Sequence, residues 1–290
     1  MPVDNRPETS LLFDWMLAEP SDNAQKTPCR PSYMRRGFEP THEPYHALVR
    51  FKSAFVGGSE RELVARALDA GRRNTSPEAI TSILDIGASD CRNTAKILEA
   101  TQGGLNSWSL ATLDPDDEAI AHTPPQVCRQ QHVSGVFQKL APGVLKLVPH
   151  VILFSHSLYY FPDPVDTLTR ALSFLPAGGR VVVSMWDHMC DLRALASKVA
   201  VAPCTPWSAQ SVYRVLSEHA RCDWVGTWRG SVDFDVWRES SEMSEIARAI
   251  LAPRAALSGA VQSRSLQSAL RAFPRRGNRQ NSVFTIRAPA

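Results

Sequence analysis

The sequence has no apolar run of the roughly 18 residues that a membrane span requires. Its first residues, MPVDNRPETS, lack the basic segment and apolar run of a secretory signal. The cysteines form no CxxC pair and have no histidine at zinc spacing. We therefore expect a soluble, cytoplasmic protein with no membrane partner, no metal site and reduced thiols. The six cysteines are Cys29, Cys91, Cys128, Cys190, Cys204 and Cys222.

A strong excess of charge of one sign is also missing. The chain has 32 Lys and Arg against 29 Asp and Glu, a formal net charge of +3. The basic residues are scattered apart from short runs at Arg72-Arg73 and Arg275-Arg276, which we expect to be solvated. Nucleic acid is therefore not an expected partner. The sequence leaves the oligomeric state open.

The chain is long and apolar enough for a substantial core. It has 290 residues, of which 43% are hydrophobic, and this suits one large α/β domain with an elaborated cap. Seven of the 21 prolines fall within residues 1–44. Because proline removes a backbone donor and disfavours helix before it, we expect a Pro-rich extension there. The folded domain is predicted over 45–290.

From Tyr45 onward the hydrophobic pattern becomes regular. Two helical segments, YHALVRFKSAF and SERELVARALDA, come first, and Ser59 with Glu62 forms a capping box that predicts the start of the second. Short apolar runs then alternate with amphipathic segments, which predicts a mainly parallel sheet covered by helices on both faces. The predicted strands are 82–87, 108–114, a weak one around 127, 151–155 and 180–186, and the predicted helices end near 100 or span 116–121, 136–147 and 165–175.

The C-terminal part follows a different order. Helical segments are predicted at 192–199 and 209–219, followed by a strand in DWVGTWRGSVDF and a last strand in SVFTIRA. The stretch 236–276, between these strands, is mainly helical in pattern. Residues 187–220 and 236–276 are therefore expected to form a cap over the sheet, where a substrate pocket can be built.

The segment ILDIGASD has the features of a ligand-binding strand end. In open parallel sheets, ligands bind beyond the carboxyl ends of the strands, and here Asp85 and Gly87 end a strand. Gly87 permits a tight turn, and Ser89 or Asp90 could cap the next helix, whose free N–H groups favour a carboxylate. S-adenosylmethionine offers such a carboxylate. A dinucleotide fits worse, because Ser89 and Arg92 replace two glycines of the GxGxxG fingerprint.

A second acid, Asp114, ends the next strand in SLATLDPDD. A carboxylate at this position can accept both hydroxyls of a ribose. The alternative is an ordinary Asp-Pro turn or a helix cap. Two acids that end successive strands together favour a nucleoside site.

These segments resemble a known family. ILDIGASD, LDPDDEAIA, FSHSLYYFPDPVDTL and LPAGGRVVVSMW are similar, in this order, to the motifs of class I S-adenosylmethionine-dependent methyltransferases. The resemblance implies a Rossmann-like α/β fold with a seven-stranded sheet, its last strand antiparallel, and S-adenosylmethionine as cofactor. Ser89 and Cys91 stand where that family often has glycine. The implied cofactor-binding residues are Asp85, Gly87, Ser89, Asp114, Pro115 and Ser155.

The layout from Tyr45 also resembles the histamine N-methyltransferase family. That resemblance assigns substrate-binding roles to Glu60, His156 and Asn281, with histidine where the family has glutamine. It implies a small-molecule methyl acceptor that need not be histamine.

The residues themselves suggest how the acceptor is handled. An amine must be unprotonated when it attacks, and His156 titrates near neutral pH at a strand end, so it is the candidate catalytic base. Tyr159 and Tyr160 could wall the pocket, although one of them is expected to be plain core. We expect methylation of nitrogen in an amine, amino acid or specialised metabolite. Small-molecule O-methylation and a non-catalytic, cofactor-binding partner subunit remain open alternatives.

Overall fold

The computed structural model describes nine segments of the chain: 58–72, 80–89, 91–115, 129–141, 143–161, 163–199, 207–234, 268–272 and 275–289. Several expectations lie outside these residues. They are the Pro-rich extension at 1–44, the helix in YHALVRFKSAF, the helix at 116–121 and most of the cap segment 236–276. The predicted domain limits and the role of the cap therefore stay predictions.

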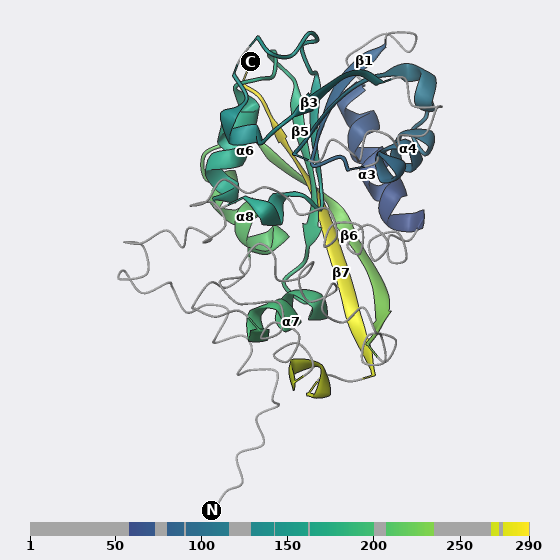
Figure 1. The fold of residues 1–290 in the computed structure, drawn as a ribbon, viewed down its shortest axis with the longest axis vertical. Coiled ribbons are helices and arrows are strands. Elements are labelled where there is room, and N and C mark those ends of the chain that lie inside the picture. Colours follow the sequence, from purple (N-terminus) through teal and green to yellow (C-terminus); the bar gives the residue numbers. More distant parts are fainter. Residues whose placement is uncertain are drawn as a thin grey trace, which may run out of the picture. The chain divides into compact units, whose positions relative to one another are not determined.

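A seven-stranded sheet forms the centre of the described structure (Figure 1). Its order is β3-β2-β1-β4-β5-β7-β6, and β7 runs antiparallel to both of its neighbours. The strand order reverses direction between β1 and β4, which is where open α/β sheets bind ligands. The strands are β1 Thr81–Ile86, β2 Trp108–Asp114, β3 Arg129–Ser134, β4 Val151–Ser155, β5 Arg180–Trp186, β6 Cys222–Asp233 and β7 Arg276–Arg287.

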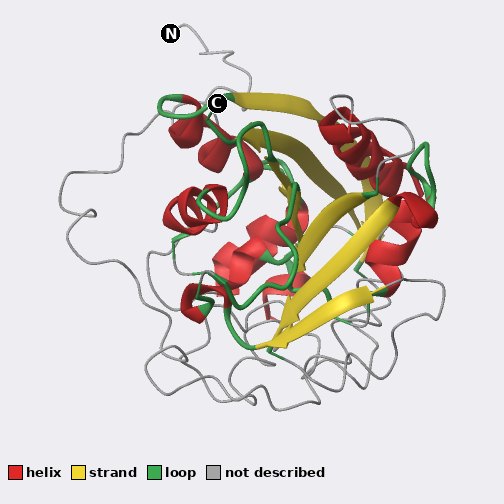
Figure 2. Ribbon diagram, turned by 90° about the horizontal axis from the view of Figure 1, so that it is seen from above, coloured by secondary structure: helices red, strands yellow, loops and turns green. Residues whose placement is uncertain are grey.

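Helices cover both faces of this sheet (Figures 1 and 2). α3 and α4 lie on one face, and α6 and α8 lie on the other, so the described core has three layers. α7 follows β5 and packs beside β7. The helices are α3 Gly58–Arg72, α4 Arg92–Glu99, α6 Pro164–Leu172, α7 Asp191–Val199 and α8 Ala209–Ser217, with short 3-10 turns at Leu105–Ser107, Phe137–Lys139 and Leu158–Tyr160.

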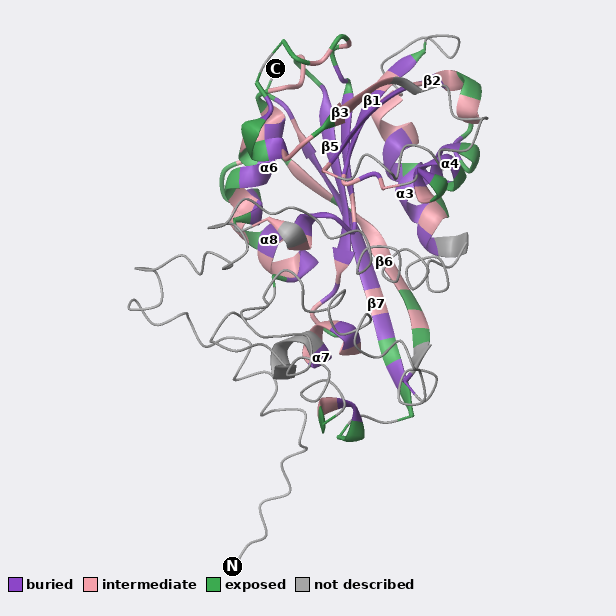
Figure 3. Ribbon diagram, in the orientation of Figure 1, coloured by how far each residue is buried: buried purple, intermediate pink, exposed green. Residues whose placement is uncertain are grey.

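The core explains why these strands read as continuous apolar runs. β4 and β5 are buried on both faces (Figure 3), because helices pack against each side of a parallel sheet. Alternate residues of β5 belong to different layers: Val181 and Val183 pack toward α6 and α8, and Val182 packs toward α3 and α4. The expectation of a parallel sheet with an antiparallel last strand is therefore confirmed.

Two local predictions are wrong. Among the described residues of the expected helix 136–147, only Phe137–Lys139 is helical, and the others form turns and loop. Phe137 and Leu140 are buried, so their helix-like spacing reflects core contact, while Pro142 and Gly143 disfavour a continuing helix. The predicted capping box also fails, because α3 begins at Gly58 and therefore contains Ser59 within its first turn.

Candidate cofactor and acceptor site

Gly87 follows β1 at the switch in strand order. β1 and β2 pair in register, and the Gly87 N–H donates to the Leu113 carbonyl at 2.8 Å, which holds the turn against β2. Gly87 has φ 75°, and a Cβ added there would lie 2.5 Å from the Cβ of Ser157. Only glycine fits both the backbone angle and this close approach. The predicted tight turn is therefore present.

The turn continues through two more left-handed residues, Ser89 and Cys91, at φ 56° and 59°. Ser89 does not cap α4. The N-cap residue is Cys91, which makes no side-chain cap hydrogen bond, so the predicted capping role of Ser89 is wrong, and Asp90 lies outside the described residues. Instead, the Ser89 backbone N–H donates to Oδ2 of Asp114 at 2.9 Å. The loop after β1 is thereby tied to the end of β2.

Both strand-end aspartates are buried, with Asp85 1% and Asp114 3% exposed. The Thr94 hydroxyl of α4 donates to Oδ2 of Asp85. This bond fixes the first turn of α4 against β1. Asp114 ends β2, and the Gly135 N–H donates to its backbone carbonyl at 3.1 Å. The two acids thus lie at the carboxyl ends of neighbouring strands, as the sequence predicts.

Two buried hydroxyls beside this turn fit a polar ligand. The Oγ atoms of Ser89 and Ser157 have no hydrogen-bond partner among the residues that the structure describes. Buried polar atoms are normally paired, so two such hydroxyls near Gly87 and Asp114 suit a bound molecule with several polar groups. S-adenosylmethionine has such groups in its amino-acid end and ribose. The residues present therefore fit this cofactor.

Ser155 and Pro115, the other predicted cofactor residues, lie at the same edge. The Ser155 hydroxyl accepts from Nδ2 of Asn93 at 3.0 Å, and Oδ1 of Asn93 accepts from Nε of Arg61 at 3.2 Å. This chain of bonds links β4 to α4 and α3. Pro115 follows Asp114 and is partly buried. Ser155 is thus held by the protein rather than left open.

Glu60, His156 and Asn281, the residues to which the family resemblance assigns substrate binding, meet in one buried cluster. Nε2 of His156 lies 2.5 Å from Oε1 of Glu60, and Nδ2 of Asn281 donates to Oε2 of Glu60 at 2.9 Å. These residues come from α3, the end of β4 and β7. All three are buried, with exposures of 2%, 5% and 0% for Glu60, His156 and Asn281. We call this group, with Ser184 and Arg279, the Glu60 cluster.

Two members of the cluster were missed in the sequence. The Ser184 hydroxyl donates to Oε1 of Glu60 at 3.0 Å, and Nη2 of Arg279 lies 3.7 Å from Oε2. Two signals could have found them. Ser184 is polar within the apolar run RVVVSMW, and Arg279 precedes Asn281 by two residues, so both face the same side of β7.

These partners set the charge of Glu60. Burial raises the pKa of its carboxyl, but His156, Arg279 and Asn281 together lower this pKa from 4.5 to about 2. Glu60 is therefore ionised at neutral pH. Both of its oxygens already accept hydrogen bonds from protein groups. The carboxylate holds the cluster together.

Tyr159 completes the contacts of His156. Its hydroxyl lies 3.2 Å from Nδ1 of His156 and accepts from the Trp186 backbone N–H. Burial raises the pKa of this hydroxyl well above 10, so it stays protonated and can donate to the imidazole. Its ring stacks on Trp186 at 4.4 Å between centroids. Both ring nitrogens of His156 thus have protein partners. The Tyr160 side chain lies outside the described residues.

Within the described segments, no three His, Cys, Asp or Glu side chains are placed to hold a metal ion. None of the helices in these segments is both long and apolar enough to cross a membrane.

The fold and this strand-end geometry define a class of protein, the class I methyltransferases. A profile of the methyltransferase-domain family matches residues 55–224, which is more than half of the chain. The protein therefore belongs to this family of S-adenosylmethionine-dependent enzymes, and its resemblance to the family is confirmed. No curated protein matches the sequence significantly.

Solved structures share the fold at low sequence identity. BH2331, a candidate methyltransferase from Bacillus halodurans, has a TM-score of 0.50 at 10% identity, over 77% of this chain and 99% of that one. YcgJ from Bacillus subtilis has a TM-score of 0.50 at 13% identity, over 78% and 98%. The N-methyltransferase NodS from Bradyrhizobium japonicum, crystallised with S-adenosylhomocysteine, has a TM-score of 0.47 at 14% identity, over 86% and 100%.

Proposed function

We propose that this protein transfers a methyl group from S-adenosylmethionine to a nitrogen atom of a small molecule. One observation carries the choice of nitrogen. Oδ1 of Asn281 is buried and has no partner among the described residues. The orientation of this amide is fixed, because the Glu60 carboxylate can only accept and so takes the Nδ2 group. A buried acceptor oxygen suits an N–H donor on the substrate, because an amine that attacks through its lone pair keeps an N–H to donate, whereas a phenol loses its O–H proton before it attacks.

The cofactor is assigned to the edge formed by β1, β2 and β4. We assign the ribose to Asp114, and the amino-acid end to Asp85, to the turn at Gly87 and to Ser89. Pro115 and Ser155 border the same edge. When bound, S-adenosylmethionine supplies an electrophilic methyl group on a sulfonium. The protein contributes by holding the nucleophile in line with that methyl, and such positioning can be worth effective molarities of about 10⁵ to 10⁸ M.

The acceptor is assigned to the neighbouring edge, where β4 and β5 end and the first half of the antiparallel β7 lies. Here Asn281 would accept a hydrogen bond from the substrate, and Tyr159 and Tyr160 would lie beside it. The ionised Glu60 is enclosed by its partners, so we assign it to holding His156 and Asn281 in place. His156 remains the predicted base. Because both of its ring nitrogens have protein partners, proton transfer to it would require Tyr159 to turn away.

The test is a mass-spectrometric screen of amines, amino acids and phenols with the purified protein and S-adenosylmethionine. We expect one added methyl group, located on nitrogen. Methylation of phenols alone would overturn the assignment in favour of O-methylation. If calorimetry shows cofactor binding but no compound gains a methyl group, a non-catalytic partner subunit would replace it.

The variant Asn281→Ala directly tests the proposed contact between Oδ1 of Asn281 and the substrate. We expect a higher KM for the amine with unchanged affinity for S-adenosylhomocysteine, because the variant removes the acceptor contact and the bond from Nδ2 to Glu60 but touches none of the residues assigned to the cofactor. Asn106→Ala is the matched control, since Asn106 is exposed in the short turn before β2. An unchanged KM for Asn281→Ala would contradict the assigned contact.

A further inference from the structure

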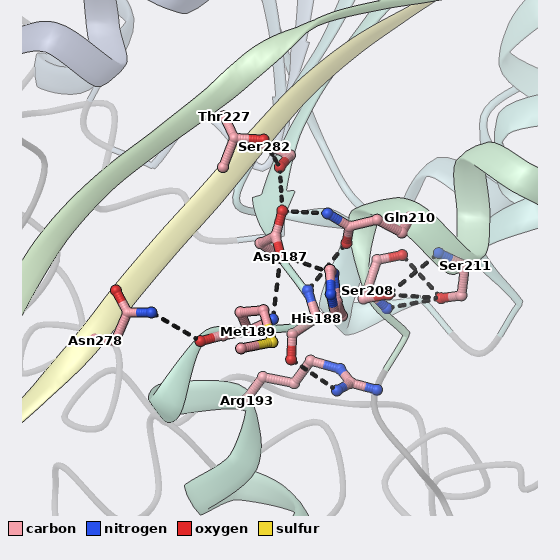
Figure 4. Close-up of polar contacts among 10 residues, drawn as sticks. All are labelled: Asp187, His188, Met189, Arg193, Ser208, Gln210, Ser211, Thr227, Asn278 and Ser282. Carbon is pink, nitrogen blue, oxygen red and sulfur yellow. Dashed lines mark hydrogen bonds and ion pairs between the residues drawn. The ribbon is translucent and has the colours of Figure 1, made fainter. Parts of the chain in front are cut away.

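A second group of polar side chains lies just beyond β5, around Asp187 (Figure 4). Asp187 is 2% exposed and follows the last residue of the strand. Its Oδ2 accepts from the Ser282 hydroxyl of β7 at 2.6 Å and from Nε2 of Gln210 in α8. Its Oδ1 accepts from the Met189 backbone N–H at 3.1 Å. One carboxylate thus ties the end of β5 to β7 and α8.

The residues around Asp187 fix the backbone that carries His188. Oε1 of Gln210 accepts from the His188 backbone N–H at 2.9 Å, so Gln210 joins both residues to α8. The Asn278 backbone N–H donates to Oδ2 of Asp191 at 2.5 Å, which ties the start of α7 to β7. His188 therefore lies on a short segment that β5, β7 and α8 hold in place. A side chain on such a support is positioned well enough for chemistry.

The two nitrogens of the His188 ring have different surroundings among the described residues. Nδ1 lies 2.9 Å from Oδ1 of Asp187, an ion pair in the protonated ring without an aligned hydrogen bond. The side chain is 32% exposed, against 3% for its partner. Nε2 has no hydrogen-bond partner among the described residues and is not among their buried unpaired atoms. A proton could be received there.

The charged groups around His188 can be named. Asp187 and Asp191 lie on its own segment and the start of α7, and Nη1 of Arg193 in α7 donates to the His188 carbonyl at 3.4 Å. The described contacts from α8 and β7, made by Gln210, Ser282 and Asn278, are uncharged. A protonated imidazole here would have Asp187 as its nearest counter-charge.

The position in the sheet places His188 on the acceptor side. The strands that we assign to the cofactor are β1, β2 and β4, and β5 is the next strand beyond β4. β4 and β5 are parallel and paired at Ser155 and Ser184, so their carboxyl ends share one edge. His188 lies two residues beyond the end of β5. It is thus near the side from which a nucleophile would approach a methyl group held over β1 and β4.

Two exposed apolar side chains belong to the same region. Met189 follows His188 and is 50% exposed, and Trp207 precedes the N-cap of α8 and is 37% exposed. Exposed large apolar side chains near a polar group suit a ligand with an apolar body and a polar end. An arylalkylamine has this form.

We propose that His188 is a catalytic base of this enzyme and that Asp187 is its positioning residue, a step that rests on the proposed N-methylation. Nε2 of His188 takes a proton from the substrate ammonium, which frees the nitrogen lone pair. The nitrogen then bonds to the methyl carbon as the carbon–sulfur bond breaks, and the bonding electrons stay on sulfur. The products are a methylated ammonium and a neutral thioether. The imidazolium, next to Asp187, finally returns its proton to water.

The test uses phenethylamine as the acceptor and follows kcat/KM between about pH 6 and pH 10. For His188→Gln we expect a loss of about 10²- to 10⁴-fold at pH 7, the usual contribution of a general base. The deficit should shrink toward pH 10, where a growing fraction of the amine is already unprotonated. Affinity for S-adenosylhomocysteine should be unchanged in calorimetry, which excludes a general loss of folding.

Two further variants make this test specific. Asp187→Asn should shift the same pH profile and depress kcat more than it raises KM, which a merely structural role would not do. His219→Gln is the matched control, because His219 lies after α8 with a side chain that is 79% exposed. Its profile should match that of the wild-type protein.

The outcomes separate this proposal from the proposed function. If the wild-type protein methylates phenethylamine and the His188→Gln profile is unchanged, the role of His188 is overturned and N-methylation stands. The same conclusion follows if His156→Gln alone produces the pH-dependent loss. If the wild-type protein methylates neither phenethylamine nor any other amine, N-methylation is overturned and the role of His188 falls with it.

Discussion

The described residues include two pairs of an acid and an imidazole at one edge of the sheet, and the pairs differ in the exposure of the imidazole and in how it meets the acid. Glu60 and His156 are both almost fully buried, and their side chains meet at 2.5 Å. Asp187 is equally buried, but His188 is 32% exposed and meets it at 2.9 Å without an aligned hydrogen bond. Both ring nitrogens of His156 have protein partners, whereas Nε2 of His188 has no hydrogen-bond partner among the described residues.

This difference shows why residue type alone does not assign a role. A buried ion pair that is fully hydrogen-bonded resists change, because removing one member leaves an uncompensated charge. A half-exposed imidazole can gain and lose a proton at lower cost, since water solvates both of its forms. The first pair is therefore suited to holding structure, and the second is suited to exchanging protons.

The largest effect is expected when the Glu60–His156 pair loses its acid. Glu60→Ala should destabilise the protein by about 3 to 5 kcal/mol, because Arg279 would lose its buried counter-charge and His156 and Asn281 would lose a charged hydrogen-bond partner. Urea unfolding measures this loss. Glu62→Ala is the control, since Glu62 is exposed on the same helix and should change stability by less than about 0.5 kcal/mol. Equal effects of the two variants would show that the Glu60 cluster is not structural.

A pH titration sharpens the same comparison. The pKa of Glu60 is lowered from 4.5 in the unfolded chain to about 2 in the fold, so its stabilising contribution is complete above pH 4.5. That contribution falls as the pH drops toward 2, by roughly 3 kcal/mol in all. Urea unfolding at several pH values should show the wild-type protein losing its advantage over Glu60→Gln in this range. A constant difference between the two proteins would contradict the lowered pKa.

Asp114 extends the comparison to a carboxylate that we assign to a ligand. Asp114→Ala should weaken S-adenosylmethionine binding by about 2 to 4 kcal/mol, because two hydrogen bonds from the ribose to a charged acceptor would be lost. Calorimetry measures this change. Asp223→Ala is the control, since Asp223 pairs with Arg287 near the other end of the sheet. Unchanged affinity for Asp114→Ala would reject its assigned role.

The sequence predicted the parts of this molecule that follow local rules. Asp85 and Asp114 could be placed at neighbouring strand ends because each follows an apolar run at the switch region of a parallel sheet. Gly87 could be assigned to a tight turn for the same reason. The strand limits of β2, β4 and β5 also match the predicted runs, since buried strands read as uninterrupted apolar segments.

What the sequence could not show depends on contacts between distant segments. Glu60 reads as an exposed residue in the first turn of a helix, and only the docking of α3 on β5 and β7 buries it. Likewise, the two nitrogens of His156 are engaged by Glu60 and Tyr159, which belong to different elements. The helix predicted at 136–147 was wrong for the opposite reason, because Phe137 and Leu140 reach the core from a short 3-10 turn and the residue after it.

The smallest expected effect separates the two imidazoles most sharply. His188→Ala should change the free energy of unfolding by no more than about 1 kcal/mol, because a partly exposed ion pair contributes little to stability. His156→Ala, which leaves Glu60 buried without its closest partner, should cost about 3 kcal/mol or more. Urea unfolding of both variants at pH 7 makes the comparison. If His188→Ala were as damaging as His156→Ala, His188 would be a structural residue like its counterpart. A stable His188→Ala protein with impaired turnover would instead separate stability from proton transfer, because then one imidazole maintains the fold and the other serves the reaction.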